Sequence, residues 1–455
     1  MRRVLLIATL IGLSWSGFAA SEIDQCRTKF TQAKDHDNAA SAAALTGLIS
    51  EAATKAAAAT HFANRRNWEI LLHDMQDAIG GMKSPEALKI FANMLPKSPP
   101  DAQVVLCMGL KRTPASADVD AAATGLIKTG VNFRVLVAAM ELAAAHKNAA
   151  AVEKIIGVLD PKAFPSVQIA ALRALAQLPD KASVPAIMKY LKGVQGDGGR
   201  YLYEATTALR AITGEKLDAI APELTRWWER NEKDWVFDPA KAKTPVYNYE
   251  LTEKKEVEYY DIPVVENRLV IVLDCSGSMQ MGGSPNRMEQ AKDALKLLIS
   301  RLRDKQMFNI VTFSNAPRRW KKTPPLVQAT EAARKEATAY VEALTAGGGT
   351  QTTSTMEETL REVAITTGCE TIFLVTDGNP NPWSQEVTNE MQVRHISWIN
   401  ESLKVRINTI GIYNRVAADN KYPAEDKEKM QEFLKKLAQN NDGIYKEIGG
   451  EAKKE

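Results

Sequence analysis

The sequence of 455 residues predicts two folded parts, an all-helical first half and an α/β second half built on a doubly wound, mostly parallel sheet. Two observations support this division. Residues 22–235 are rich in Ala and Leu at helical spacing and contain few runs of β-branched residues. From residue 269 onward, short apolar runs alternate with amphipathic helical patterns, which is the rhythm of a parallel sheet covered by helices.

The overall composition is that of an ordinary globular protein. Hydrophobic residues make up 45% of the sequence and charged residues 25%, which excludes a disordered polyelectrolyte. Lys and Arg together number 58 against 55 Asp and Glu, and they form no block of the kind that nucleic-acid binding needs. The five histidines are scattered singly, which disfavours histidine-based metal or triad chemistry.

Residues 1–20 have the features of a secretory signal peptide. Arg2 and Arg3 precede an apolar run, and small residues end the segment. The run from Val4 to Leu13 is short for a membrane span, which takes about 20 residues. We therefore expect an exported protein, periplasmic or secreted, with no membrane span after cleavage.

The cysteines are too sparse for a disulfide scaffold. A disulfide between Cys26 and Cys107 stays open. Cys275 follows one predicted strand, whereas Cys369 precedes the neighbouring strand. At about 3.3 Å per residue these two positions are more than about 20 Å apart, well beyond the Cα separation of about 7 Å that a disulfide allows. We predict that Cys275 and Cys369 are unpaired.

Helical patterns recur within the first half. The segment Val137–Leu142 recurs as Ile169–Ala174, 32 residues later, and Ala171–Leu175 recurs as Ala208–Ile212 after 37. This period predicts stacked helical hairpins and is similar to that of HEAT-like repeats. Whether the stack binds proteins or only supports the second half stays open. We expect the tryptophans that end this half, at 227, 228 and 235, to cap the last hairpin or to seat the next domain.

The predicted domains follow from these patterns. We assign residues 21–235 to the helical domain, 236–262 to a linker, 263–450 to the α/β domain and 451–455 to a charged tail. Strands are predicted at 269–273, 308–313, 372–376, 405–413 and 443–448, with a short edge strand at 317–322 and helices at 286–303, 328–344, 353–366, 386–402 and 427–439.

Oxygen-bearing side chains gather where two of these strands end. Asp274, Ser276 and Ser278 directly follow the first strand, Asp377 follows a later one, and Thr350 ends a run of three glycines between them. The carboxyl ends of parallel strands share one edge of a sheet, so we expect these side chains to converge. Two carboxylates and three hydroxyls make a hard oxygen site that suits Mg²⁺, and Mn²⁺ would also fit.

The order of these motifs, D-x-S-x-S, then G-G-G-T, then T-D-G, resembles the von Willebrand factor A domain and its metal-ion-dependent adhesion site over residues 262–450. The resemblance implies direct or water-mediated metal contacts from Asp274, Ser276, Ser278, Thr350 and Asp377. It also implies that a partner's Asp or Glu completes the metal shell, in adhesion, complex assembly or matrix contact. The fold alone does not choose among these roles.

The loops that follow Ser278 and Asp377 should form the rim of the metal face. Asn379, Asn381 and Trp383 are therefore candidate ligand contacts, although Trp383 packing down into its own loop is the favoured alternative for that residue.

The leading hypothesis is an exported interaction or adhesion protein that binds an acidic partner group through the metal. In the alternative, partners dock on the helical repeats and the metal only stabilises the fold. We predict no enzyme, because G-x-S-x-G, H-E-x-x-H and Walker motifs are missing and His395, on a predicted helix, is the only histidine of the second half. The sequence predicts neither the partner's identity nor the oligomeric state.

Overall fold

The computed structural model describes residues 19–194, 199–247, 257–378, 380–413 and 424–449. These residues fall into two compact units. One unit comprises residues up to 126 together with 141–146, and the other comprises residues 127–140 together with those from 147 onward. The second unit therefore contains both helical repeats and the sheet, and the domain junction at 236–262 stays a prediction.

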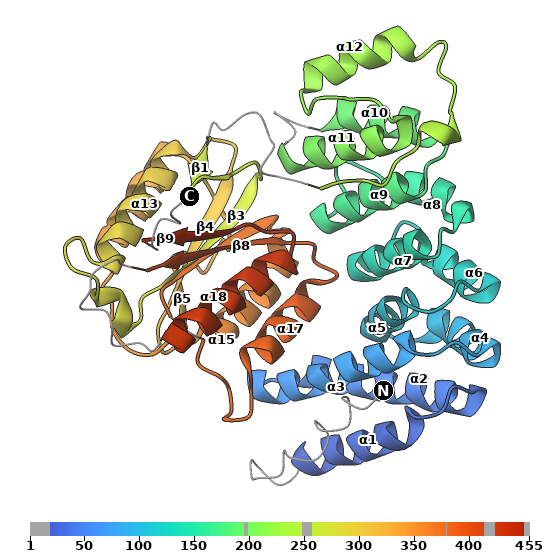
Figure 1. Cartoon of the computed structure of the whole chain (residues 1–455), viewed down its shortest axis with the longest axis horizontal. Helices are drawn as coiled ribbons and strands as arrows, with labels where there is room; N and C mark the ends of the chain where they lie inside the picture. Colours follow the sequence, from blue (N-terminus) through green and yellow to red (C-terminus); the bar gives the residue numbers. More distant parts are fainter. Residues whose placement is uncertain (1–18, 195–198, 248–256, 379, 414–423, 450–455) are drawn as a thin grey trace. The chain divides into compact units, whose positions relative to one another are not determined.

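The first half is helical, as predicted (Figure 1). Its helices are α1 (Ala19–Ala33), α2 (Ala39–Ala58), α3 (Phe62–Gly80), α4 (Pro85–Met94), α5 (Pro100–Leu110), α6 (Ala117–Leu126), α7 (Phe133–Ala145), α8 (Val152–Val158), α9 (Pro165–Gln177), α10 (Ser183–Gly193), α11 (Gly199–Thr213) and α12 (Ala221–Asn231). Helix α4 shows how local sequence sets a boundary. The Ser84 hydroxyl accepts a hydrogen bond from the Ala87 N–H, and Pro85 fills the first turn, where no N–H is needed.

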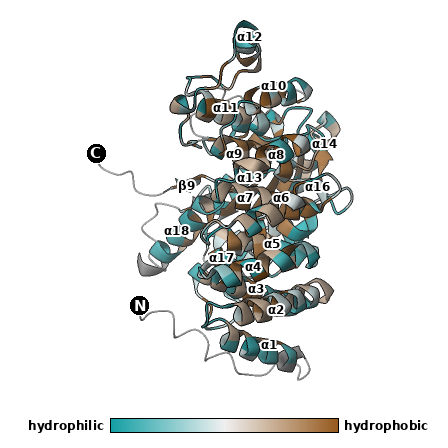
Figure 2. Ribbon diagram, turned by 90° about the vertical axis from the view of Figure 1, so that its right-hand side faces the viewer, coloured by the Kyte–Doolittle hydropathy of each residue, from teal (hydrophilic) through white to brown (hydrophobic). Residues whose placement is uncertain are grey.

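The helices of the repeats are amphipathic, with brown apolar and teal polar residues mixed along single helices in Figure 2. The recurring segments fall on equivalent helices, since Ile169–Ala174 lies on α9 and Ala208–Ile212 on α11. Most of their apolar side chains are buried. After α12, the three tryptophan rings at 227, 228 and 235 pack together with centroids 6.0–6.5 Å apart, which agrees with the predicted cap.

The second half is built on a seven-stranded sheet with the order β5-β4-β3-β7-β8-β9, and β6 pairs with β4. Its strands are β3 (Arg268–Asp274), β4 (Met307–Phe313), β5 (Pro317–Arg319), β6 (Val327–Gln328), β7 (Thr371–Thr376), β8 (Arg406–Ile412) and β9 (Tyr445–Ile448). The pairs among β4, β3, β7, β8 and β9 are parallel, whereas β5 and β6 run antiparallel to β4.

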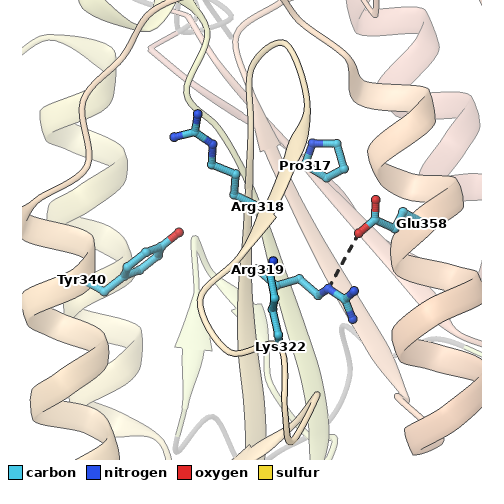
Figure 3. Close-up of a pocket in the computed structure, with 6 residues that line it drawn as sticks. All are labelled: Pro317, Arg318, Arg319, Lys322, Tyr340 and Glu358. Atoms are coloured by element: carbon cyan, nitrogen blue, oxygen red, sulfur yellow. Dashed lines mark ion pairs between the residues drawn. The ribbon is translucent and has the colours of Figure 1, made fainter.

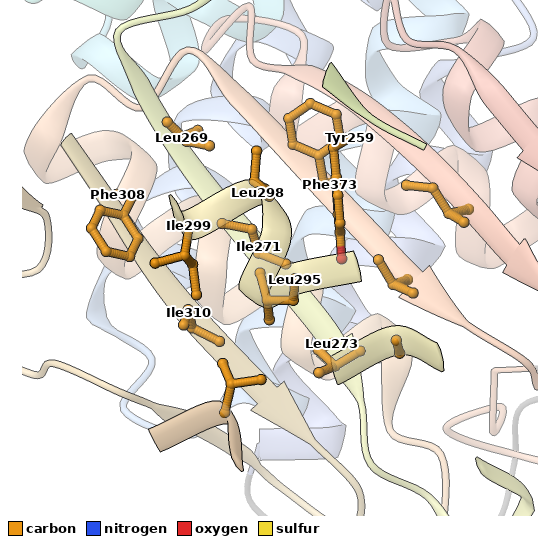
Figure 4. Packing of buried hydrophobic residues seen from close by; sticks show 14 of the residues in the cluster. Tyr259, Leu269, Ile271, Leu273, Leu295, Leu298, Ile299, Phe308, Ile310 and Phe373 are labelled. Atoms are coloured by element: carbon orange, nitrogen blue, oxygen red, sulfur yellow. The ribbon is translucent and has the colours of Figure 1, made fainter. Parts of the chain in front are cut away.

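Helices cover both faces of this sheet, which confirms the doubly wound α/β fold. Residues of β3 alternate between the faces. Leu269, Ile271 and Leu273 pack on one face with α13 (Arg287–Arg301) and α14 (Glu331–Glu342), as Figure 4 shows for α13. Val270 and Val272 pack on the other face. The helices there are α15 (Thr352–Glu358), α16 (Ile365–Thr367), α17 (Asn389–Asn400) and α18 (Ala424–Gln439). Burial on both faces explains the continuous apolar run of β3.

Two local features differ from the sequence prediction. The predicted linker contains a hairpin of β1 (Glu258–Tyr259) and β2 (Ile262–Pro263), and the Tyr259 ring packs edge-on against Phe373 at 5.5 Å. The predicted helix over 353–366 contains a π-helical segment, η6 (Thr359–Ala364). Residues 1–18 of the predicted signal peptide and the predicted tail at 451–455 lie outside the described residues. Within the described ranges, no helix combines the length and apolar character needed to cross a membrane.

Candidate metal centre

The two predicted carboxylates lie side by side because β3 and β7 are neighbouring parallel strands. Asp274 is the last residue of β3, and Asp377 follows the last residue of β7. The Thr376 hydroxyl donates a hydrogen bond to Asp274 Oδ2, so the two strand ends are joined directly. Both carboxylates are buried, with exposed fractions of 0% for Asp274 and 4% for Asp377.

The two serines link these carboxylates. The Ser276 N–H donates to Asp274 Oδ1 over 2.7 Å, and the Ser276 and Ser278 hydroxyls are 3.0 Å apart. The Ser278 hydroxyl donates to Asp377 Oδ1 over 2.8 Å. These contacts form a continuous chain of hydrogen-bonded residues from one carboxylate to the other.

Thr350 reaches the same place through its glycine-rich loop. Backbone hydrogen bonds tie this loop to the turn after β3, from Gly347 N to Cys275 O over 2.8 Å and from Gly277 N to Gly348 O over 3.0 Å. A Cβ placed on Gly378 would lie 3.5 Å from Thr350 Oγ1 and 3.9 Å from Asp274 Oδ2. The Thr350 hydroxyl and the Asp274 carboxylate therefore both lie close to Gly378, and the structure places all five predicted site residues around the carboxyl ends of β3 and β7.

The electrostatics of this cluster favour a bound cation. Burial and the neighbouring Asp377 carboxylate together raise the pKa of Asp274 to about 7, against the opposing effect of hydrogen bonds from Thr376 and Ser276. Burial also raises the pKa of Asp377, against the opposing effect of Arg287 and Ser278. Two adjacent buried carboxylates are costly to ionise, and a divalent cation between them would offset that cost.

Arg287 is the charged neighbour that the sequence reasoning missed. It is the first residue of α13, its exposed fraction is 5%, and its Nη1 lies 2.7 Å from Asp377 Oδ2. The start of α13 is fixed by a capping box in which the Asn286 side chain and Glu289 exchange hydrogen bonds with each other's backbone N–H groups. That capping sequence was the only available signal, and it predicts a helix start rather than contact with Asp377.

The donor set is compatible with the metals that the sequence predicts. Across the part of the chain that the structure describes, no group of three or more His, Cys, Asp or Glu side chains is arranged to hold a metal. A metal at this place would therefore depend on two carboxylates and three hydroxyls. Such a hard, oxygen-only set fits Mg²⁺ or Mn²⁺ and suits soft metals poorly.

The predicted rim residues differ in their placement. Asn379 lies outside the described residues. Asn381 is exposed, and its N–H donates to Thr350 O over 2.9 Å, so it lies at the rim. The Trp383 ring packs edge-on against His395 at 5.8 Å, which agrees with the alternative of a tryptophan that packs into its loop. His395 is itself buried, with its Nε2 2.7 Å from Glu357 Oε1, which agrees with a packing role.

The cysteines take no part in this cluster. All four are free thiols, which confirms the prediction for Cys275 and Cys369 and leaves Cys26 and Cys107 unbridged. Burial raises the pKa of the Cys275 thiol to about 12, so a thiolate ligand to a metal is disfavoured there.

Comparison with known proteins agrees with this architecture. Residues 267–446 match the family model of the von Willebrand factor type A domain, and residues 167–193 match that of the PBS lyase HEAT-like repeat. The human von Willebrand factor A domain-containing protein 3A is 32% identical over 186 residues, which cover 40% of this chain and 13% of that protein. The mouse inter alpha-trypsin inhibitor, heavy chain 4, is 29% identical over 128 residues, which cover 26% of this chain and 13% of that protein.

Solved structures of the same domain type are also similar. A von Willebrand factor type A structure from Catenulispora acidiphila is 26% identical and covers 40% of this chain and 38% of that chain, with a TM-score of 0.32. In the two sequence relatives, from human and mouse, the match with this chain covers only 13% of the relative's own length.

Proposed function

We propose that this chain, with its von Willebrand factor type A domain and its HEAT-like repeat, is an exported interaction or adhesion protein. In this proposal the domain holds a divalent metal, Mg²⁺ or Mn²⁺, through Asp274, Ser276, Ser278, Thr350 and Asp377. The partner is a protein that presents an Asp or Glu carboxylate to that metal.

The observation that carries the proposal is the chain of hydrogen bonds that runs from Asp274 through Ser276 and Ser278 to Asp377. Three of the five donors are neutral hydroxyls, so a bound divalent cation would keep positive charge and attract an outside carboxylate. The buried carboxylates orient the hydroxyls, and Arg287 holds Asp377 in place by its ion pair. Asn381 and its loop then lie where a partner would contact the rim.

We propose no catalytic role for this cluster. Metal coordination would lower the basicity of both carboxylates, which makes them poor general bases. His395, the only histidine of the second half of the sequence, lies against Glu357. The relatives described above support an interaction role for the domain and do not identify a reaction.

A second candidate function is a scaffold in which partners dock on the helical repeats and the metal only stabilises the fold. The HEAT-like match over residues 167–193 supports this candidate. The two candidates differ in whether partner binding needs the metal.

Metal binding is tested directly by titrating the purified protein with Mn²⁺ and following the free ion by electron paramagnetic resonance. Asp274→Ala and Asp377→Asn should abolish saturable binding, whereas Ser384→Ala, an exposed serine on the same loop as Asn381, should retain it. Saturable binding that survives both aspartate substitutions would overturn the metal centre.

Partner binding is tested by capture from the host's extracytoplasmic fraction in Mg²⁺ and in EDTA. A partner retained by the wild-type protein in Mg²⁺, and lost both in EDTA and with Asp274→Ala, supports the adhesion proposal. A partner retained equally in all of these conditions supports the scaffold instead.

A further inference from the structure

The outermost strand β5 borders a hollow beside the candidate metal centre. The hollow has a volume of about 470 Å³ and is lined by Pro317, Arg318, Arg319, Lys322, Tyr340 and Glu358. In Figure 3, Arg318 lies on the side of Tyr340 from α14, whereas Arg319 points toward Glu358 from α15. The hollow therefore straddles the edge of the sheet between two helices.

This hollow carries an excess of positive charge. Arg319 Nε lies 3.7 Å from Glu358 Oε1, so the single carboxylate in the lining already has a cation. The next lysine along the chain, Lys321, pairs with Glu336. Arg318 and Lys322 are exposed, and neither has an ion pair among the described residues. Two cations are thus available to an outside anion.

Strand β4 lies between β5, which lines the hollow, and β3, which ends at the candidate metal centre. Phe313 is in register with Asp274 on one side and with Pro317 on the other. The turn between β4 and β5 is also bonded to the glycine-rich loop of the metal centre, from Gln351 N to Ser314 O over 3.0 Å and from Gly349 N to Asn315 Oδ1 over 2.7 Å. Two strand spacings of about 4.8 Å place Pro317 about 10 Å from Asp274.

Charged residues on an edge strand also deter pairing with another sheet. That role explains the arginines and lysines but requires neither a hollow around them nor a position beside the metal centre. The combination of cations without an ion pair among the described residues, space for a ligand and a position one strand away from β3 points to binding.

We propose that the basic edge at Arg318 and Lys322 is a second anion subsite of the same interaction surface, and that its ligand is an acidic segment of the partner protein. This inference rests on the proposed function. One carboxylate of the segment completes the metal shell, and a second carboxylate binds at Arg318 and Lys322. In an extended peptide at about 3.3 Å per residue, the separation of about 10 Å between Asp274 and Pro317, at the near end of the hollow, corresponds to acidic residues at least about three positions apart.

The test uses two short synthetic peptides of Gly and Ser, one with a single Asp and one with the sequence Asp-Gly-Ser-Asp at its centre. Their affinities for the full chain are measured by fluorescence anisotropy in Mg²⁺ and in EDTA. The second Asp should tighten binding about three- to tenfold at low ionic strength, and added salt should reduce the gain. The gain should disappear in the double variant Arg318→Gln/Lys322→Gln.

The matched control is Lys305→Gln/Lys335→Gln, which removes the same charge from two exposed lysines outside the hollow and should keep the gain. Equal affinities for both peptides, with binding that still needs Mg²⁺, overturn the second subsite alone. Binding of the single-Asp peptide that is equal in EDTA overturns the proposed function. Failure of both peptides to bind contradicts both.

A sulfated oligosaccharide probe separates the protein ligand from a glycan. If such a probe binds in EDTA more tightly than the two-Asp peptide binds in Mg²⁺, and loses affinity with Arg318→Gln/Lys322→Gln, the basic edge serves a glycan and the proposal is wrong.

Discussion

Arg287 gives Asp377 a cation whether or not a metal is bound. Replacing it with methionine would leave the Asp377 carboxylate buried with its main counter-charge removed, at a cost of about 3 kcal/mol. A bound Mg²⁺ would restore the missing positive charge. We therefore expect Arg287→Met to lower the melting temperature strongly in EDTA and much less in Mg²⁺.

Thermal unfolding in the two conditions checks this expectation, with Arg301→Met as the control because Arg301 is exposed at the other end of α13. An equal loss of stability in EDTA and in Mg²⁺ would show that Arg287 acts only in packing.

Glu370 makes stability depend on pH. It precedes β7, and its burial and the nearby Glu266 together raise its pKa to about 7, against the opposing effects of Arg200 and Arg268. The folded state binds the proton of the Glu370 carboxyl group more tightly than the unfolded state does. The contribution of this protonation to the stability of the fold is therefore complete below about pH 4.5 and is lost as pH rises through about 7. Glu370→Gln should therefore melt higher than the wild type at pH 8 and close to it at pH 5.

Melting curves at both pH values check this prediction. The exposed Glu428→Gln should follow the wild type at both values. A Glu370→Gln variant that is less stable at pH 8 would show that the carboxylate is needed in its ionised form.

The sequence predicts the five oxygen donors but not the charges around them. The donors stand next to strand ends and a glycine run, so their motifs carry both the residue types and the local geometry. Arg287 contacts Asp377 from 90 residues away, and Glu370, which precedes β7, interacts with Arg200 on α11. No periodicity or local motif records contacts of that kind.

At the scale of elements, the prediction succeeds where hydrophobic patterns are long. The strands β3, β4, β7 and β8 and the helix α13 appear within a few residues of their predicted bounds. The hairpin of β1 and β2 was missed because each strand has only two residues, too few for an alternating pattern. The edge strand β5 was predicted from its proline and charges, although its role beside a hollow was not.

Helix α13 provides a direct test of how its apolar stripe stabilises the sheet. Leu295 is fully buried against β3, whereas Leu297 is 50% exposed on the same helix. Leu295→Ala should cost about 3 kcal/mol through lost burial and a cavity, and Leu297→Ala should cost less than about 1 kcal/mol. Denaturant midpoints of the two variants check this difference, and similar shifts for both would contradict the packing of α13.

At the scale of the whole molecule, the second compact unit joins helical repeats to the sheet through polar contacts, those of Arg200 being buried. The guanidinium of Arg200 on α11 has an exposed fraction of 0% and donates to Glu370 O over 2.9 Å and to Lys404 O over 2.8 Å. Arg173 on α9 donates to Asp442 over 2.6 Å, and Arg173 and Arg200 lower the pKa of Asp442 to about 2 against the opposing effect of burial. These contacts lie at the amino ends of β7, β8 and β9, whereas the candidate metal centre lies at the carboxyl ends.

The contacts of Arg173 and Arg200 with the sheet thus lie at the opposite ends of the strands from the candidate metal centre. This arrangement leads to a prediction about the cooperativity of unfolding. Arg200→Met would leave the two carbonyl groups without their donor, and hydrogen bonds from a charged donor are worth about 1.5–3 kcal/mol each. We expect the repeats from α8 to α12 and the sheet to unfold together in the wild type and in two steps in Arg200→Met. Mn²⁺ affinity should be unchanged, because the metal ligands lie at the other end of the strands.

Calorimetry detects the number of transitions, and hydrogen exchange shows whether α11 loses protection before β7. Arg226→Met on α12 is the control, since that arginine is exposed. One transition at the wild-type temperature would mean that Arg200 does not couple the repeats to the sheet. A loss of Mn²⁺ binding in Arg200→Met would mean that the contacts of Arg200 with the sheet and the metal centre are linked through the strands. The repeats would then act on the binding surface as well as supporting it.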